Sequence, residues 1–244
     1  MTIECLLVVL GVESKFMPRT LVIGDVHGCL RELEALLLAC NASRDDRVVL
    51  VGDLVAKGPD SRGVLKLVRD LGARAVRGNH DHAVLRWYDP ILQGTAPPRG
   101  TQHLNIARQL DEQDWAVLLG LPLFLRLPEL TAIVVHGGLL PRVPIEQQSS
   151  DLLMNMRTVR PDGSGSRRAE DGELWGKFWP GPELVVFGHH ATAGLQQHPF
   201  AIGLDTGCVY GGRLTAVILP ERRFVSVPAH EVYAPIDAER RGRA

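Results

Sequence analysis

The chain has 244 residues, of which 45% are hydrophobic and 23% are charged, a composition typical of a globular protein long enough to bury one core. Its 27 Lys and Arg residues nearly balance its 28 Asp and Glu residues, for a formal net charge of -1. A protein that clamps nucleic acid generally carries a marked basic excess, so this balance argues against general nucleic-acid binding.

The cysteines are spread along the chain without a Cys-x-x-Cys pair, at Cys5, Cys29, Cys40 and Cys208. This spacing argues against a structural zinc knuckle and a disulfide scaffold, and it favours a reducing cytoplasm. The apolar run Cys5 to Gly11 is too short to span a bilayer and follows an acidic start, so we expect no membrane anchor. Because the strand pattern begins near Thr20, we expect residues 1–17 to form a poorly packed extension.

The first half alternates β-branched runs with amphipathic helical stretches, which predicts strand-helix-strand units and a largely parallel sheet. The expected strands are Leu21 to Ile23, Val48 to Val51 and Ala73 to Val76. Helices are expected where leucines recur from Leu30 to Leu37, and from Val64 to Leu71 with Asp60 or Ser61 as the cap. A helical insertion is expected at about residues 87–130, with a capped helix from Asp111 to Leu119.

The second half returns to short strands separated by turns, which predicts a second sheet with antiparallel character. These strands are expected at Ala132 to Val135, Leu184 to Phe187, Phe200 to Leu204, Leu214 to Leu219 and Phe224 to Val227. The polar segment Pro161 to Gly172 is expected to be a mobile loop, or alternatively a lid whose Arg167 and Arg168 meet an anionic substrate. We expect one domain over residues 18–236 with an α/β fold, followed by a disordered tail over residues 237–244.

Five of the expected strands end in a small residue or a β-branched residue followed directly by a side chain that can bind a metal. These side chains are Asp25, Asp53, Asn79, His136 and His189. In α/β sheets the loops at the carboxyl ends of the strands converge on one crevice, so these residues are expected to meet although they are far apart in the sequence. A single motif of this kind more often stabilises a turn than binds a metal. Five such motifs in order, each directly after an expected strand, favour a metal site instead.

The donors are carboxylate and amide oxygens and imidazole nitrogens, without thiolates, which suits manganese, iron or zinc. We expect Asp53 to bridge two metal ions, with Asp25 and His27 on one of them. Asn79, His136 and His189 are expected on the other. Two ions roughly 3.5–4 Å apart can activate a bridging water and clamp the oxygens of an in-line displacement at phosphorus, so the expected nucleophile is hydroxide.

Other side chains near these motifs are assigned to proton transfer and phosphate binding. His80 is expected to be the general acid and Asp81 the carboxylate that orients it. Lys57 and Arg77 are expected to contact phosphate oxygens, although alone each would be an ordinary surface charge. His190 is either a support for the metal site or structural, and the histidines without strand-end context are expected not to be ligands, namely His82, His103, His198 and His230.

The ordered blocks resemble those of the calcineurin-like metallophosphoesterases of the phosphoprotein-phosphatase superfamily, and the resemblance extends from about Thr20 to Val227. The blocks are Gly24-Asp25-Val26-His27-Gly28, Gly52-Asp53, Gly78-Asn79-His80-Asp81, His136-Gly137-Gly138 and Gly188-His189. Two further stretches are similar to the bacterial diadenosine tetraphosphatases and the phosphatases like them. These are Lys57-Gly58-Pro59 and the segment from Leu204 to Ala216.

The resemblance implies a four-layer αββα sandwich with two central mixed sheets and a dinuclear centre that uses manganese, with iron, zinc, cobalt or magnesium as alternatives. It implies hydrolysis of phosphoanhydrides in dinucleoside polyphosphates such as diadenosine tetraphosphate, with ADP as product. It also makes Arg157 and Tyr210 expected substrate contacts. The replacement of the arginine of the protein phosphatases by Lys57 puts in doubt any role that needs a bidentate guanidinium.

Other functions remain open from the residues alone. A phosphoprotein phosphatase acting on serine, threonine or tyrosine phosphate would use the same active-centre residues, and polyphosphate or capped RNA are further candidate substrates. A cysteine-based phosphatase is disfavoured because only four residues separate Cys208 from Arg213, one fewer than its phosphate-binding loop needs. A scaffold without activity would have no need for an open metal site.

Overall fold

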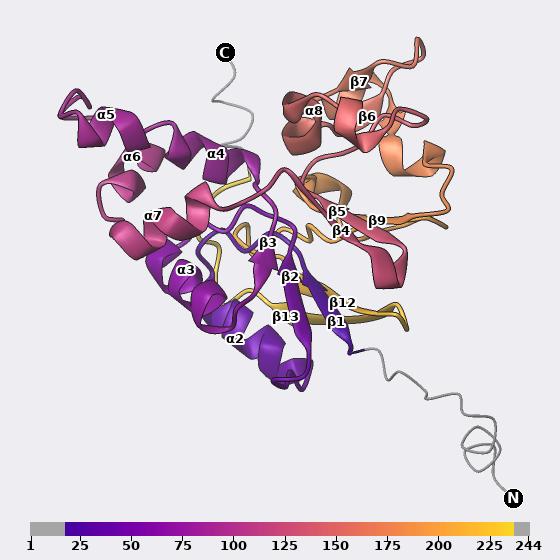
Figure 1. Cartoon of the computed structure of the whole chain (residues 1–244), viewed down its shortest axis with the longest axis horizontal. Coiled ribbons are helices and arrows are strands. Elements are labelled where there is room, and N and C mark those ends of the chain that lie inside the picture. Colours follow the sequence, from indigo (N-terminus) through magenta and orange to yellow (C-terminus); the bar gives the residue numbers. More distant parts are fainter. Residues whose placement is uncertain (1–17, 237–244) are drawn as a thin grey trace, which may run out of the picture.

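The computed structural model describes residues 18–236, and the expected N-terminal extension and C-terminal tail lie outside the described residues. Two five-stranded mixed sheets form its centre, which confirms the expected α/β fold with two mixed sheets (Figure 1). None of the helices within these residues is both long and apolar enough to cross a membrane.

The first sheet has the strand order β13-β12-β1-β2-β3. Its parallel part, expected from the strand-helix-strand pattern, is β1 (Thr20–Ile23), β2 (Arg47–Leu50) and β3 (Arg74–Ala75). The C-terminal strands β12 (Arg213–Leu219) and β13 (Arg223–Pro228) extend it by antiparallel pairing beside β1. The sheet therefore joins the two ends of the described chain.

The second sheet has the order β10-β11-β9-β5-β4. Its parallel centre is β5 (Ala132–Val135), β9 (Leu184–Phe187) and β11 (Ala201–Gly203). The edge strands β4 (Phe124–Leu127) and β10 (Gln196–Gln197) pair antiparallel. Strand β4 corrects the expected helical insertion over residues 87–130, because Leu125 and Leu127 alternate with exposed Arg126 and pack on the sheet as a strand does.

The alternation of side chains along each strand explains the layers. On β1, Val22 faces the second sheet and packs in a shared core with Val134 and Val186. Leu21 and Ile23 point the other way, into a core with α2 (Leu30–Ala39), α3 (Ser61–Asp70) and α7 (Glu112–Leu119). As expected, the side chain of Asp60 caps α3 by accepting from the amide of Gly63.

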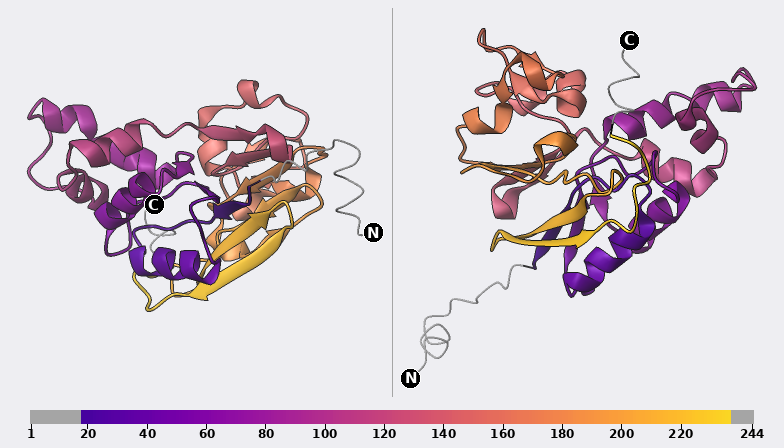
Figure 2. Two further views of the ribbon diagram at one scale, coloured as in Figure 1. Left: turned by 60° about the horizontal axis from the view of Figure 1, so that its bottom comes forward. Right: turned by 180° about the vertical axis from the view of Figure 1, so that it is seen from behind.

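Two groups of short elements stand on either side of the strand ends, as the views in Figure 1 and Figure 2 agree. One holds α4 (Asn79–Leu85), α5 (Tyr88–Leu92), α6 (Gln102–Ala107) and α7. The other covers the outer face of the second sheet with α8 (Ser150–Asn155) and a small sheet of β6 (Thr158–Val159), β7 (Gly165–Ser166) and β8 (Glu173–Leu174). Short 3-10 helices connect the elements, namely η1 (Pro128–Leu130), η2 (Ile145–Gln147), η3 (Ala169–Asp171), η4 (Trp175–Phe178) and η5 (Ala191–Ala193).

The small sheet corrects the expectation of a mobile loop from Pro161 to Gly172. The carboxylate of Asp171 accepts from Arg160 and from the hydroxyl of Ser166, which ties the two ends of this segment together. Arg167, proposed above for a lid, is paired with Asp151 of α8 instead. Internal charge pairs thus order a sequence whose Gly and Ser content is typical of a flexible loop.

Candidate metal centre

The carboxyl ends of strands from both sheets bring the predicted ligands together. Asp25 follows β1, Asp53 follows β2, Asn79 begins α4 after β3, and His136 and His189 follow β5 and β9. The side chains of the charged and imidazole ligands are 0–5% exposed. Convergence of strand ends thus produces one buried cluster from residues separated by up to 164 positions.

One half of the cluster contains Asp25, His27 and Asp53, which can each offer a ligand atom within 4.8 Å of the others. The Nε2 atom of His27 lies 3.4 Å from Oδ2 of Asp53. Its other ring nitrogen, Nδ1, lies 3.3 Å from the carbonyl oxygen of Val55. Because a carbonyl can only accept, Nδ1 carries the hydrogen and Nε2 presents a lone pair to the cluster.

The other half is centred on Asn79. Its Oδ1 atom lies 3.0 Å from Nε2 of His136 and 2.9 Å from Nδ1 of His189. Nε2 of His136 is also 3.4 Å from Oδ2 of Asp53, so this carboxylate faces both halves. The distal ring nitrogens point to backbone carbonyls, Nδ1 of His136 to Val51 at 2.9 Å and Nε2 of His189 to Asn155 at 3.0 Å.

This donor set fits a cation. The pKa of His189 is held well below its usual value, by burial first and then by the charge of Arg157, so the ring is neutral. With the hydrogen on Nε2, its Nδ1 lone pair faces the amide oxygen of Asn79, and two acceptors 2.9 Å apart need a positive charge between them. The two divalent ions that the ligand pattern predicts would meet that need.

The pKa values of His136, Asp53 and Asp25 also indicate that the cluster favours a bound positive charge. Burial alone would lower the pKa of His136, but the charge of Asp53, its hydrogen bond to the ring and the charge of Asp25 together outweigh burial and raise this pKa to about 10. The pKa of Asp53 is held well below its usual value, because neighbouring histidines led by His136 outweigh its burial. Burial and the charge of Asp205 raise the pKa of Asp25. A metal ion would supply the charge that the proton on His136 supplies here.

The backbone around the ligands is strained, as is common at functional sites. His27, Asp53 and His189 have φ values of 49°, 50° and 70°, in the left-handed region that residues other than glycine rarely adopt. Two neighbouring glycines leave space for the carboxylates. A Cβ atom on Gly78 would lie 2.1 Å from Oδ1 of Asp53, and one on Gly188 would lie 2.0 Å from Oδ1 of Asp25.

His80 lies beside the cluster. Its backbone amide donates to Oδ1 of Asp53 at 2.9 Å, and its ring meets that of His27 edge-on with centroids 5.0 Å apart. Its Nδ1 atom is 2.9 Å from Nε2 of His103, a residue that the sequence had placed among the non-ligands. His103 lies on α6, 23 residues away, and no motif or strand end signals its approach.

Asp81 has a different environment from the one expected of a partner for the His80 ring. Its fully buried carboxylate accepts from the backbone amides of Leu54, Val55 and Gly78. Burial first, and then the charge of Asp53, raise its pKa to about 7. The carboxylate therefore anchors the loop that carries Asp53, while a ring nitrogen of His103 lies within hydrogen-bond distance of the His80 ring.

The predicted phosphate contacts lie at different distances from the cluster. The Nζ atom of Lys57 is 3.3 Å from Nε2 of His27, a predicted ligand, and 2.5 Å from the hydroxyl of Tyr210, so Tyr210 is linked to the cluster through Lys57. Arg157 is 9% exposed and its charge acts on His189. Arg77 instead lowers the pKa of His82, second to the effect of burial, and no contact recorded between described residues joins its side chain to a ligand.

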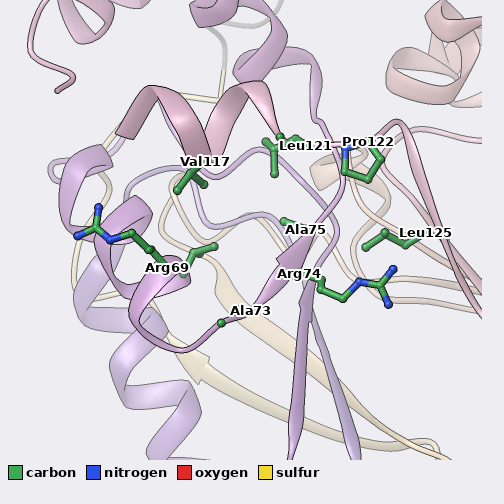
Figure 3. A pocket seen from close by; sticks show the side chains of 11 residues that line it. Arg69, Ala73, Arg74, Ala75, Val117, Leu121, Pro122 and Leu125 are labelled. Atoms are coloured by element: carbon green, nitrogen blue, oxygen red, sulfur yellow. The ribbon is translucent and has the colours of Figure 1, made fainter. Parts of the chain in front are cut away.

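A separate cavity of about 470 Å³ lies between α3, β3 and α7. Its lining includes Arg69, Arg74, Val117 and Leu125, which Figure 3 shows around the edge strand β3. None of the predicted ligands or acid-base residues lines it, and it contains no carboxylate or imidazole. This cavity is not part of the metal centre.

Comparison with known proteins agrees with the site. Residues 18–225 match the profile of the family described as calcineurin-like phosphoesterase. A bis(5'-nucleosyl)-tetraphosphatase PrpE [asymmetrical] of Oceanobacillus iheyensis is 30% identical over 87% of this chain and 93% of its own length. A bis(5'-nucleosyl)-tetraphosphatase, symmetrical, of Yersinia enterocolitica is 31% identical over 89% and 94%.

A solved structure points the same way. It belongs to a protein proposed to be a diadenosine tetraphosphatase, is 38% identical, covers 88% of this chain and 95% of its own, and superposes with a TM-score of 0.80. The strand-end ligands, the two mixed sheets and these similarities have one common explanation. The chain belongs to the calcineurin-like phosphoesterase family and is a metallophosphoesterase hydrolase.

Proposed function

We propose that this protein is a dinuclear metal-dependent phosphohydrolase that cleaves a phosphoanhydride bond of dinucleoside polyphosphates such as diadenosine tetraphosphate, releasing ADP. The observation that carries the proposal is the convergence of six predicted ligands, Asp53 among them, with Lys57 beside His27 and Tyr210 beside Lys57. The named activity of the relatives supports the substrate class. Those relatives include both a symmetrical and an asymmetrical enzyme, so the products need a direct test.

Asp25, His27 and Asp53 would hold one cation, and Asp53 together with Asn79, His136 and His189 would hold the other. Bound divalent cations supply Lewis acidity toward the phosphoryl oxygens and lower the pKa of a water molecule. Manganese is the proposed metal, because carboxylate, amide and imidazole donors without thiolates suit it. The described cysteines are free and buried, which is compatible with the proposed cytoplasmic site of action.

The chain's own residues then bind the phosphates and handle the proton. The Lys57 ammonium, beside His27 and the Tyr210 hydroxyl, is placed to contact a phosphate oxygen as a point charge. Arg157 would do the same on the His189 side. His80 would donate a proton to the leaving oxygen, with His103 positioning its ring. ADP leaves readily, so the demand on this proton is light.

The test is hydrolysis of diadenosine tetraphosphate by the manganese-loaded protein, with products separated and identified. ADP alone is expected, with activity lost on chelation and restored by manganese. ATP with AMP as products would contradict the proposed symmetrical cleavage. A tenfold or greater preference in kcat/KM for a phosphopeptide would instead favour a phosphoprotein phosphatase. An Asp53→Asn variant that folds and keeps full activity would exclude the two-metal site.

A further inference from the structure

A second cavity lies next to the metal centre, between α4, α5 and α6. It measures about 390 Å³, within the range of pockets that hold small ligands. Arg86, Trp87, Thr101 and His103 are among the residues that line it. His103 is the residue whose ring nitrogen lies 2.9 Å from His80, so one side chain forms part of both the cavity wall and the catalytic surroundings.

The course of α4 connects the two places. His80 and Ala83 are three residues apart on α4, and Trp87 follows one turn later, so the three occupy one side of this segment. At a helical rise of 1.5 Å per residue, Trp87 lies roughly 10 Å along the axis from His80. The distance is of the order that separates the terminal phosphate from the base in an extended nucleotide.

The charges of the metal centre also reach this wall. The pKa of His103 is lowered, by burial first, while the carboxylate of Asp53 opposes that shift and the ammonium of Lys57 adds to it. Both groups are therefore close enough to His103 to act on it electrostatically. If a substrate phosphate lies at Asp53 and Lys57, the base of the nucleoside attached to it is therefore expected to reach the cavity.

The chemistry of the lining suits a nucleobase. Trp87 and His103 offer aromatic surfaces for stacking, and Arg86 and Thr101 offer hydrogen-bond donors at the exposed rim. No carboxylate lines the cavity, so an anionic nucleotide meets no like charge there. An indole ring stacks on a base but offers an inorganic phosphate no comparable contact.

We propose that this cavity is the subsite for the base of one nucleoside arm of the substrate, with Trp87 as the stacking residue. The proposal rests on the proposed function and deepens it. It explains how a metal centre shared by many phosphoesterases can select a dinucleoside polyphosphate, because the base would be held on α4 while the phosphates lie at the metals.

The test compares a substrate that has a base with one that lacks it. In Trp87→Ala, kcat/KM for diadenosine tetraphosphate is expected to fall about tenfold, the typical worth of one stacked base, while kcat/KM for p-nitrophenyl phosphate stays within twofold. Trp87 also packs against the core, so a second variant is needed. Ala83→Phe fills the cavity without removing a core contact and is expected to give the same selective fall.

Phe178→Ala is the matched control, because it removes another partly exposed aromatic ring, 45% exposed on η4 away from the cavity. This variant should leave kcat/KM unchanged for both substrates. Equal falls on both substrates in the Trp87 and Ala83 variants, or no fall on the dinucleotide, would overturn the base subsite.

Failure of the proposed function is distinguishable from failure of the subsite. If the wild-type protein hydrolyses p-nitrophenyl phosphate but no dinucleoside polyphosphate, the proposed function is wrong. Quenching of tryptophan fluorescence by ADP then tests separately whether the cavity binds a nucleobase. Quenching that disappears in Trp87→Phe supports base binding there, and quenching that persists in this variant, or is absent from the wild type, overturns it.

Discussion

Replacement of Asp81 by asparagine separates its two candidate roles. The carboxylate accepts from the amides of Leu54 at 2.9 Å, Val55 at 3.2 Å and Gly78 at 2.9 Å, all in a buried site. In Asp81→Asn, one oxygen can still serve Leu54 and Val55, but the new NH₂ group faces the amide of Gly78. One hydrogen bond is lost, at about 1 kcal/mol, and the buried amide of Gly78 is left without an acceptor, at about 1–3 kcal/mol. At pH values well below 7, where Asp81 is protonated in the folded protein, we expect a loss of up to about 2–4 kcal/mol in the free energy of unfolding. The loss shrinks as pH rises toward 7, because the raised pKa makes the ionised carboxylate of the wild type unfavourable in the folded protein.

The measurement is urea denaturation of the metal-free protein at pH 5, below the pKa of about 7 that burial imposes on Asp81. Manganese affinity should fall with stability, because the loop that carries Asp53 loses its anchor. His80→Asn is the matched control at the neighbouring position. It should lower kcat with a stability change below about 0.5 kcal/mol, as for other substitutions outside the core.

The reverse result would refute this reasoning. If Asp81→Asn keeps the stability and the metal affinity of the wild type and loses only kcat, Asp81 acts on the His80 ring. The environment of the carboxylate among backbone amides would then be incidental to its role.

Three other substitutions test further parts of the structure. His103→Ala should leave metal content unchanged and lower kcat about tenfold on phenyl phosphate but less on p-nitrophenyl phosphate, because only the poorer leaving group needs a proton. Equal falls in kcat on both substrates would contradict the proposal that His103 positions the His80 ring as the acid. Gly188→Ala places a Cβ atom 2.0 Å from Oδ1 of Asp25, so metal analysis should find fewer than two ions per chain, and full occupancy would contradict the steric argument. In Asp46→Asn the bidentate ion pair with Arg19 is lost, so the free energy of unfolding near pH 7 should fall. The hydrogen bond from Arg19 lowers the pKa of Asp46, so the pair stabilises above the unfolded pKa near 4 and this contribution fades as pH falls further; a stability difference that is constant from pH 7 to pH 3 would count against it.

Most of the strands could be predicted because hydrophobic periodicity is a local property of the chain. Their division between the two sheets could not, because β12 and β13, expected in the second sheet, pair beside β1 in the first. The runs at Val48 and Val134 are apolar enough to lie between layers, and the cap at Asp60 needs only three residues of context. The cluster of candidate ligands was predictable for a related reason. Once a residue follows a parallel strand, the direction of that strand places it at one edge of the sheet.

Contacts between segments without a shared pattern could not be predicted. His103 reaches His80 only because α6 packs against α4, and nothing around it in the sequence distinguishes it from a surface histidine. Asp81 directly follows His80, which suggested an orienting partner, but the start of α4 turns its carboxylate toward the backbone of the Asp53 loop. The Gly- and Ser-rich stretch after Arg160 is ordered by an ion pair that composition does not reveal.

The same division applies to substrate recognition. Motifs predict Lys57 as a phosphate contact, but its contact with Tyr210 joins residues 153 positions apart. The cavity around Trp87 exists only between three short helices that each have little stability of their own. Strand-end residues were predictable because backbone direction places them. The partner of the proposed acid His80 and the candidate base subsite depend instead on how separate helices pack, which no local pattern encodes.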